Sequence, residues 1–351
     1  MAKRVIMAVS PEHLQRAGVG EQLAVWEDGI RAPTGRGYFE WWYNDCHFDD
    51  GSTAVVVFAT KSILDRNKPL MPSMAVTITT ADGKAARSYD IYPAEQFSAS
   101  TETCDVRIGP NWITGDLHTY TLHAETRNGA VIDLTMTGIA PAWRPGAGMN
   151  FYDEALTRYF GWLPAIPYGS VEGKISVDGR TRAVRGACYH DHNWGNIGLN
   201  QVMSHWYWGR AHLGDFTSIF VEMTALPAFG SQKMPVFMLA KGDQLLTGDG
   251  APLKLTITDF VPQQRRRSYP QKVDFDWQGE QGSVHIRLRQ PEVIEGASLL
   301  GLLPKWQKRV ARLFTNPYYF RFNTELDLKI DLGDLHEAIR GPALYEMMLL
   351  R

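Results

Sequence analysis

The sequence predicts an all-β protein made of antiparallel strands, arranged as two β domains that follow one another along the chain. Short β-rich runs separated by turns that contain glycine predict the strands, and no long stretch shows a helical period. Length predicts the second domain, because 351 residues suffice for one large β domain and a smaller one. We place the domains at residues 1–227 and 228–351.

The composition is typical of a globular protein with a developed core. Hydrophobic residues make up 44% of the chain and charged residues 21%, which excludes a disordered protein. The net charge of −2 gives no electrostatic reason to expect nucleic-acid binding. The cysteines Cys46, Cys104 and Cys188 share no metal-ligand spacing and cannot all pair, which favours a reducing compartment. No apolar run reaches the roughly 18 residues of a membrane span, so we expect a cytoplasmic protein.

The N-terminal half begins with an arm, residues 1–36, that holds a short helix near residues 12–16. Asp50-Gly51 then favours a two-residue hairpin turn between two β-rich runs. Such a turn would place Tyr43 opposite Phe58 and Glu40 opposite Lys61, the latter as a cross-strand ion pair. Further strands are expected at 74–80, 84–92, 117–123 and 130–138.

The segment 141–167 breaks this rhythm with prolines and aromatic residues, which is typical of a lid or a pocket wall. Beyond it, Gly214-Asp215 predicts a hairpin in which Tyr207 lies opposite Glu222. Residues 226–231 resemble a linker. The later strands are expected at 234–241, 253–261, 272–278, 283–289, 318–330 and 343–349.

Residues 299–314 combine apolar side chains at helical spacing with basic side chains elsewhere. Such a helix either closes the end of a barrel or lies on a membrane surface. Peripheral membrane association through this segment is therefore an alternative to a purely cytoplasmic location.

The stretch from Tyr189 to Gly195 is the strongest candidate for a functional site. His190, Asp191, His192 and Asn193 follow one another directly. A strand this dense in polar side chains binds a ligand or performs acid–base chemistry. The alternative is a polar plug inside a barrel, in which neighbouring groups satisfy every hydrogen bond.

Glu222 is a second candidate, because it is the one charge in the run 217–225. Burial should raise the pKa of this carboxyl, which would suit a general acid. The alternative is a structural glutamate that hydrogen-bonds to Tyr207.

A metal site at His190 and His192 is the competing chemistry, because a spacing of two puts both imidazoles on one face of a strand. No third ligand follows at a plausible spacing, and Asp191 points the other way. We therefore expect no metal and no other cofactor.

Together, Glu40-Trp41-Trp42-Tyr43 and Tyr189–Gly195 resemble motifs of the lipocalin-like AttH and carotenoid 1,2-hydratase (hydroxyneurosporene synthase) superfamily. Kievitone hydratase and the lipocalin-like Diels–Alderases look like relatives. The resemblance covers most of residues 38–351. It implies two tandem lipocalin-like antiparallel β-barrel domains, with a hydrophobic pocket in or between them and no metal.

The resemblance also implies a hydro-lyase that adds water to a C=C bond of a hydrophobic isoprenoid or polyketide-like substrate. Two alternatives stay open: a cofactor-free cyclase of the Diels–Alderase kind in natural-product biosynthesis, and a non-catalytic lipocalin-like carrier. A carboxyl that projects into the apolar pocket would distinguish an enzyme from a carrier.

Hydration needs an acid, a held water and an aromatic wall that stabilises a cation. The candidate catalytic residues are Asp191, Glu222, His190 and His192. We expect residues 190–194 and 206–210 to line one cavity, and a hydrophobic small molecule to be the partner. The candidate substrate-binding residues are Glu40, Trp41, Tyr43, Asn193, Trp194, Trp206, Tyr207, Trp208 and Arg210.

Overall fold

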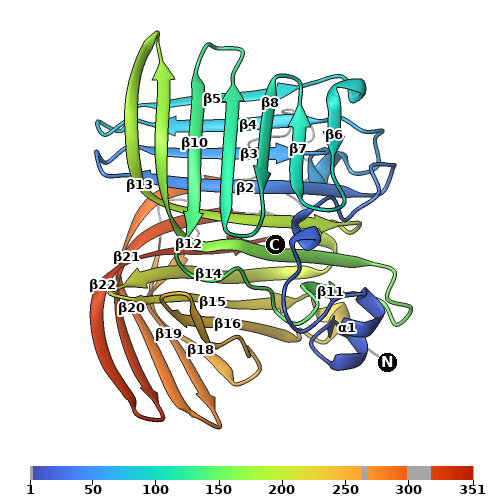
Figure 1. Ribbon diagram of the computed structural model, residues 1–351. Helices are drawn as coiled ribbons and strands as arrows, with labels where there is room; N and C mark the ends of the chain where they lie inside the picture. The colour runs from blue at the N-terminus through green and yellow to red at the C-terminus, as the bar shows by residue number, and fades with distance from the viewer. Residues whose placement is uncertain (1–2, 263–267, 299–317, 351) are drawn as a thin grey trace. The chain divides into compact units, whose positions relative to one another are not determined.

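The structure, a computed structural model, describes residues 3–262, 268–298 and 318–350. The chain forms two compact units. The N-terminal unit is Ile6–Gly198, and the C-terminal unit is Leu199–Arg351 together with Met1–Val5. Each unit contains one curled antiparallel sheet (Figure 1). This confirms the predicted all-β class with two lipocalin-like barrels.

The sheet of the N-terminal unit has 13 strands among the described residues, in the order β5-β4-β3-β2-β13-β12-β10-β9-β8-β7-β6, with β1 and β11 beside this path. Long β12 and β13 form its centre, so the candidate stretch 189–195 lies in the middle of the sheet. The strands are β1 Ile6–Met7, β2 Phe39–Phe48, β3 Thr53–Ala59, β4 Ser73–Thr79, β5 Ala85–Ile91, β6 Phe97–Ala99, β7 Cys104–Ile108, β8 Asn111–Gly115, β9 Thr119–Glu125, β10 Val131–Gly138, β11 Met149–Phe151, β12 Tyr159–Val177 and β13 Arg180–Gly195.

The helical elements of this unit are short. The α-helix α1, Pro11–Ala17, begins after Ser10, whose hydroxyl accepts from the His13 backbone N–H, and it ends at Gly18 with a φ of +68°. This confirms the helix expected near residues 12–16. The 3₁₀ turns are η1 Val25–Asp28, η2 Ile63–Asp65 and η3 Ala94–Gln96.

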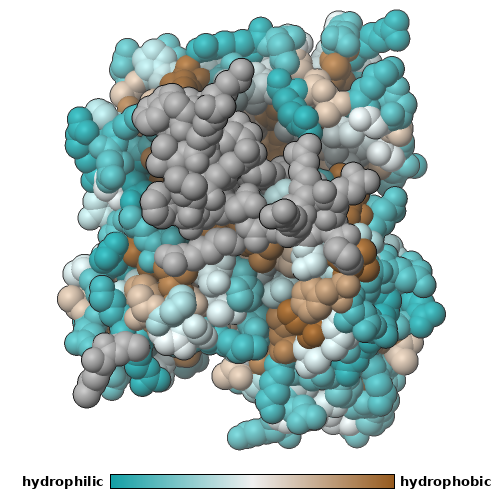
Figure 2. Space-filling model, turned by 180° about the vertical axis from the view of Figure 1, so that it is seen from behind, coloured by the Kyte–Doolittle hydropathy of each residue, from teal (hydrophilic) through white to brown (hydrophobic). Residues whose placement is uncertain are grey.

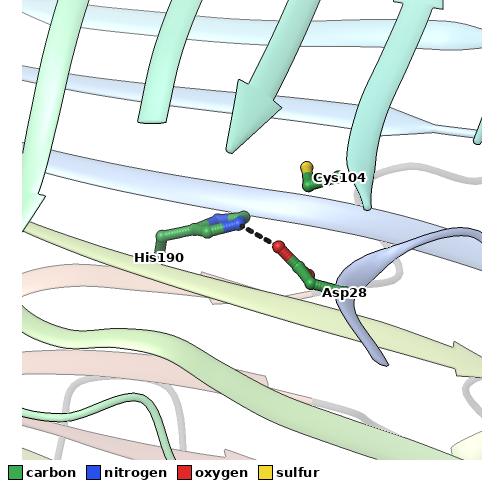
Figure 3. A group of neighbouring side chains, drawn as sticks. All are labelled: Asp28, Cys104 and His190. Carbon is green, nitrogen blue, oxygen red and sulfur yellow. Dashed lines mark ion pairs between the residues drawn. The ribbon is translucent and has the colours of Figure 1, made fainter. Parts of the chain in front are cut away.

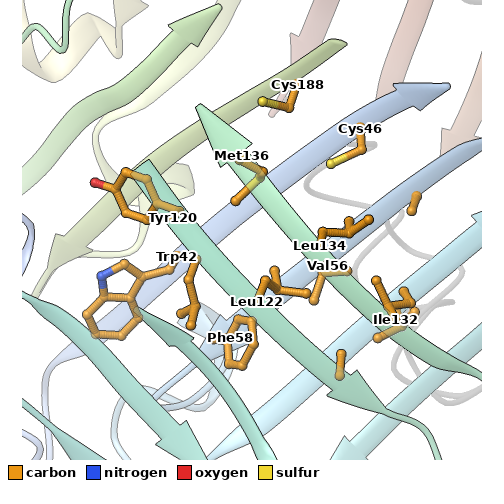
Figure 4. Close-up of a cluster of buried hydrophobic side chains, with 14 of the residues drawn as sticks. Trp42, Cys46, Val56, Phe58, Tyr120, Leu122, Ile132, Leu134, Met136 and Cys188 are labelled. Carbon is orange, nitrogen blue, oxygen red and sulfur yellow. The ribbon is translucent and has the colours of Figure 1, made fainter. Parts of the chain in front are cut away.

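The core of the N-terminal unit is formed by the inward-facing side chains of the curled sheet. Figure 4 shows Trp42 and Phe58 from neighbouring strands facing Leu122 and Met136 from β9 and β10. Because side chains alternate between the two faces of a strand, each of these strands contributes every second residue to the interior.

The sheet of the C-terminal unit has nine strands among the described residues, in the order β17-β16-β15-β14-β22-β21-β20-β19-β18. Its core contains stacked aromatic rings, for example Phe322 on Tyr345. The elements are η4 Leu199–Gln201, β14 Met203–Leu213, β15 Phe216–Ala225, η5 Pro227–Phe229, β16 Lys233–Lys241, β17 Gln244–Thr247, β18 Leu253–Pro262, β19 Ser268–Gly279, β20 Gly282–Ser298, β21 Tyr318–Leu332 and β22 Leu335–Leu349.

The hairpin between β2 and β3 corrects the predicted register. Its loop has three residues, 49–51, with Gly51 at a φ of +83°, so the strands shift by one position. Tyr43 therefore lies opposite Val57, and the backbone of Glu40 bonds to Thr60. The predicted ion pair between Glu40 and Lys61 is wrong, because the Lys61 ammonium donates to three backbone carbonyls instead.

The hairpin around Gly214-Asp215 has the predicted two-residue turn. Tyr207 lies opposite Glu222, as expected. The segment 226–231 is a turn between β15 and β16 of the same sheet rather than a linker. The domain limits 1–227 and 228–351 stay a prediction, and the amphipathic segment 299–314 lies outside the described residues.

The predicted lid is only partly correct. Residues 159–167 belong to β12 and are bonded to β13, because the aromatic run continues the sheet. Residues 149–156 do contribute to a pocket wall, as described below.

Hydrophilic residues cover much of the face seen in Figure 2, with hydrophobic residues in smaller groups between them. In the described part of the chain, no helix has the length and apolar character needed to cross a membrane.

Candidate functional site

Strand β13 divides the candidate residues between its two faces. It lies between β2 and β12, and its side chains alternate along the strand. His190 and His192 point into the barrel, where both are 0% exposed. Asp191 and Asn193 point away from that interior. The sequence motif therefore forms two separate groups of polar residues, each with its own partners.

The interior group contains a carboxylate that the sequence analysis missed. Asp28, the last residue of η1, lies between the two imidazoles. Its Oδ2 is 3.4 Å from His190 Nε2, and its Oδ1 is 3.2 Å from His192 Nδ1. The Tyr120 hydroxyl donates to Oδ2 at 2.6 Å. These contacts make Asp28 the centre of the buried group.

Glu40 completes the interior group on the other side of His192. Its Oε1 is 2.7 Å from His192 Nε2. The backbone N–H groups of Arg31 and Ala32 donate to the same carboxylate, at 2.7 and 2.9 Å. Glu40 is thus a fully buried acceptor for these three groups, and its role in substrate binding stays a prediction.

The charges of this group stabilise one another. Burial opposes ionisation of Asp28, but its ion-pair contacts with His190 and His192 outweigh burial and hold the pKa of Asp28 below its ordinary value. Burial also opposes protonation of His192, but Asp28 and Glu40 outweigh it and raise the pKa of this histidine. The geometry therefore favours carboxylates paired with an imidazolium, which is a closed ion-pair network.

Aromatic rings enclose the network. The ring of Trp42 stacks on His192 at 4.6 Å, and its indole N–H donates to the backbone carbonyl of Asp28 at 3.1 Å. The ring of Tyr120 meets His190 edge-on at 4.6 Å. Such rings exclude water, and burial raises the pKa of Tyr120 well above its ordinary value.

The turn η1 reaches this position because of its local sequence. The Glu27 carboxylate accepts from the backbone N–H of Ala24 at 3.0 Å and pairs with Arg144 at 2.6 Å. Gly29 follows, and a Cβ there would lie 2.8 Å from the carbonyl of Ser100. Glycine thus allows the close approach that inserts η1 into the barrel, whereas an extended arm had been expected.

Asp191 is held by three donors on the opposite face of β13. Its Oδ2 accepts from Trp162 Nε1 at 2.8 Å and from the Tyr189 hydroxyl at 2.7 Å. Its Oδ1 accepts from Asn193 Nδ2 at 2.7 Å. Burial raises the pKa of Asp191, although these hydrogen bonds oppose the shift.

Glu222 belongs to the C-terminal unit, where it is 5% exposed. The ammonium of Lys233 lies 2.9 Å from its Oε1. The sequence predicted either a general acid or a hydrogen bond to Tyr207 at this position. It did not predict the ion pair with Lys233. Tyr207 lies opposite Glu222 and stacks on Tyr345, and burial raises its pKa to about 12.

The remaining predicted binding residues occupy both units. Trp41 stacks on Phe39 at 5.6 Å, and Tyr43 meets Tyr189 edge-on at 6.3 Å. In the C-terminal unit, three side chains of β14 lie half-buried on the face opposite Tyr207: Trp206, Trp208 and Arg210. A cavity shared by residues 190–194 and 206–210 stays a prediction.

An open pocket of about 280 Å³ lies in the N-terminal unit beside Trp194. Arg31 lies over the Trp194 ring, with its guanidinium carbon 5.1 Å from the ring centroid. Burial lowers the pKa of Arg31, against the opposing charge of Glu27. The pocket is lined by His13, Arg16, Ala17, Arg31, Met149, Phe151, Leu156, Tyr159 and Trp194.

A metal could be held by one group of side chains in the described part of the chain. Asp28, Cys104 and His190 lie close together in the interior of the N-terminal unit (Figure 3). The sequence contains no spacing that reveals this group, because the three residues come from η1, β7 and β13. The one available signal was the acidic pair Glu27-Asp28 beside Trp26 in an otherwise weakly patterned arm.

Solved structures with the same fold cover nearly the whole chain. CghA bound to Sch210972 has a TM-score of 0.62 at 13% identity, over 89% of this chain and 88% of that one. An AttH-type protein from Nitrosomonas europaea has a TM-score of 0.58 at 16% identity, over 94% of this chain and 98% of that one. Kievitone hydratase from Nectria haematococca has a TM-score of 0.57 at 14% identity, over 99% of this chain and 98% of that one. These likenesses confirm the predicted AttH-like lipocalin fold, and at such identities they show the fold alone.

Sequence relatives are fungal proteins named ceramide-binding protein svf1. The one from Schizosaccharomyces pombe is 20% identical over 260 residues, which is 68% of this chain and 67% of the relative. The one from Emericella nidulans is 23% identical over 236 residues, which is 61% of this chain and 60% of the relative. The chain thus spans less than two thirds of the length of the second relative. The Svf1 family model matches residues 79–349, most of the chain. The protein is therefore a member of the Svf1 family.

Proposed function

We propose that the protein is a carrier that binds a hydrophobic lipid with a polar head, of the ceramide class, without transforming it. The observation that carries this proposal is the chemistry of the pocket beside Trp194. Its lining combines apolar side chains with arginine and histidine, and includes no carboxylate. The carboxylates of the N-terminal candidate site are instead held by donors from the chain itself.

The pocket suits an amphipathic ligand. Met149, Phe151 and Leu156 offer apolar contact, while Arg16 and Arg31 can donate hydrogen bonds to hydroxyl and amide oxygens. A volume of about 280 Å³ lies just below the usual range for ligand sites. It therefore fits the head and first carbons of a lipid rather than its full chains. The svf1 relatives, named for ceramide binding, support the same ligand class.

The proposal is tested by filling the pocket. Ala17→Trp places a large ring in the lining, and Ala81→Trp adds the same ring at an exposed turn as a matched control. Binding is measured with a fluorescent ceramide titrated into each purified protein. We expect Ala17→Trp to weaken binding at least tenfold, a loss of about 1.4 kcal/mol of binding free energy. Ala81→Trp should leave the affinity within twofold of wild type. Equal affinity of the two variants would show that this pocket does not hold the lipid.

Hydration of a C=C bond is the second candidate function, and one observation favours it. Burial raises the pKa of Asp191, which is the property required of a proton donor. Against it, all three groups around Asp191 donate to its oxygens. Such a set stabilises a carboxylate, and the acid would have to break one of these bonds to present its proton.

A further inference from the structure

Three potential metal ligands converge inside the N-terminal barrel. Asp28 comes from η1, Cys104 is the first residue of β7, and His190 comes from the middle of β13. One ligand atom of each lies within 4.8 Å of the others. Their exposed fractions are 1%, 0% and 0%. Figure 3 shows His190 and Asp28 facing each other, with their ion pair marked, and Cys104 beside them.

The two ring nitrogens of His190 have different surroundings. Its Nδ1 is 2.8 Å from the backbone carbonyl of Tyr43, and a carbonyl can only accept, so Nδ1 carries a hydrogen. The other nitrogen, Nε2, has no hydrogen bond and faces Asp28 Oδ2 at 3.4 Å. Metal-binding histidines are commonly oriented in this way, with the second ring nitrogen donating to a carbonyl.

The other two ligands complete a plausible donor set. A thiolate, an imidazole and a carboxylate are the groups that bind Zn²⁺. The Tyr120 hydroxyl donates to Asp28 Oδ2 at 2.6 Å and so fixes the carboxylate from a second side. Ligand atoms around a tetrahedral zinc lie on the order of 3.5 Å apart, given bonds of about 2.0–2.3 Å. The three side chains would therefore have to approach one another by about 1 Å.

We propose that Asp28, Cys104 and His190 bind one divalent transition metal ion, Zn²⁺ by the chemistry of the ligands, and that the ion fastens η1 to the barrel wall. This reverses the expectation drawn from the sequence, which considered only His190 and His192. His192 differs from His190 in that both of its ring nitrogens face carboxylates, Nδ1 that of Asp28 and Nε2 that of Glu40. Binding replaces the thiol proton of Cys104, which is released to solvent.

The test must load the metal during folding, because the ligands are buried. The full chain is unfolded, then refolded with ZnCl₂ or CoCl₂, and passed over a desalting column. We expect about one metal ion per chain by elemental analysis, and a thiolate-to-cobalt absorption band in the near ultraviolet. Cys104→Ser should lose the band and most of the metal. Cys46→Ser, another buried cysteine of the same core, is the matched control and should keep both.

Two results would overturn the proposal. One is wild-type protein that refolds to its native circular dichroism spectrum with no metal above the level of the buffer. The other is a metal content that is the same in Cys104→Ser and Cys46→Ser. His190→Gln provides a second variant if Cys104→Ser does not fold, and it should lower zinc content at least tenfold. The metal proposal does not depend on ceramide binding. Ceramide binding is measured in parallel, so that failure of one proposal is distinguished from failure of the other.

Discussion

Glu40→Gln removes one charge from the buried network while keeping the shape of the side chain. The two oxygens of Glu40 accept from His192 Nε2, Arg31 N and Ala32 N at 2.7–2.9 Å. An amide has a single oxygen, so its NH₂ group would face at least one of these donors. Hydrogen bonds to a charged group contribute about 1.5–3 kcal/mol, and breaking a buried ion pair costs about 3–5 kcal/mol.

We expect Glu40→Gln to lower the free energy of unfolding of the N-terminal unit by about 3 kcal/mol. This is the lower end of the range for a buried pair, because Asp28 still pairs with His192. Urea unfolding followed by tryptophan fluorescence measures the loss as a lower midpoint at unchanged slope. Glu154→Gln, at an exposed position, is the control and should change stability by less than about 0.5 kcal/mol. A Glu40→Gln protein as stable as this control would refute the account of the network.

Three further outcomes are expected. Burial lowers the pKa of both His205 and His212 below 6.5. Their contribution to stability is therefore present above pH 6.5 and is lost as the pH falls through their pKa values in the folded state. Urea midpoints of the C-terminal unit that do not fall between about pH 7 and pH 5 would contradict this prediction. Gly161→Ala places a Cβ 2.2 Å from a tryptophan ring, whereas Gly35→Ala meets nothing within 4 Å, so thermal unfolding should show a loss of about 1–3 kcal/mol for the first only. Asp191→Asn should lower stability by about 1–3 kcal/mol, because the amide cannot accept from all three donors around Asp191. The affinity for fluorescent ceramide should stay within twofold of wild type. A loss of affinity would instead place Asp191 at the ligand.

The sequence predicted those parts of the fold that depend on local turns. Gly214-Asp215 closes a two-residue loop, so the register of Tyr207 against Glu222 followed directly from the sequence. Asp50-Gly51 carries the same type of signal but closes a three-residue loop, which shifted the register by one. Loop length depends on hydrogen bonds around Phe48 and Ser52 that residue types alone do not reveal.

The candidate site was only half predictable, for a related reason. Strand alternation correctly separates His190 and His192 from Asp191. Some partners of the histidines come from neighbouring β2, but others come from η1, β7 and β9, and no periodic pattern links these three elements to β13. Asp28 in particular lies in a segment expected to be an arm. Its insertion depends on tertiary contacts, such as that of Gly29 with Ser100.

The most direct test of the central claim, binding without chemistry, is the mass of the bound lipid after long incubation. The protein is mixed with an equimolar ceramide that contains a C=C bond, in water enriched in heavy oxygen, and the lipid is then extracted and weighed by mass spectrometry. The carrier account predicts that the protein protects about one lipid per chain and releases it with unchanged mass. A lipid that gains the elements of water with the heavy label, in wild type but not in Asp191→Asn, would contradict the account and establish a hydratase.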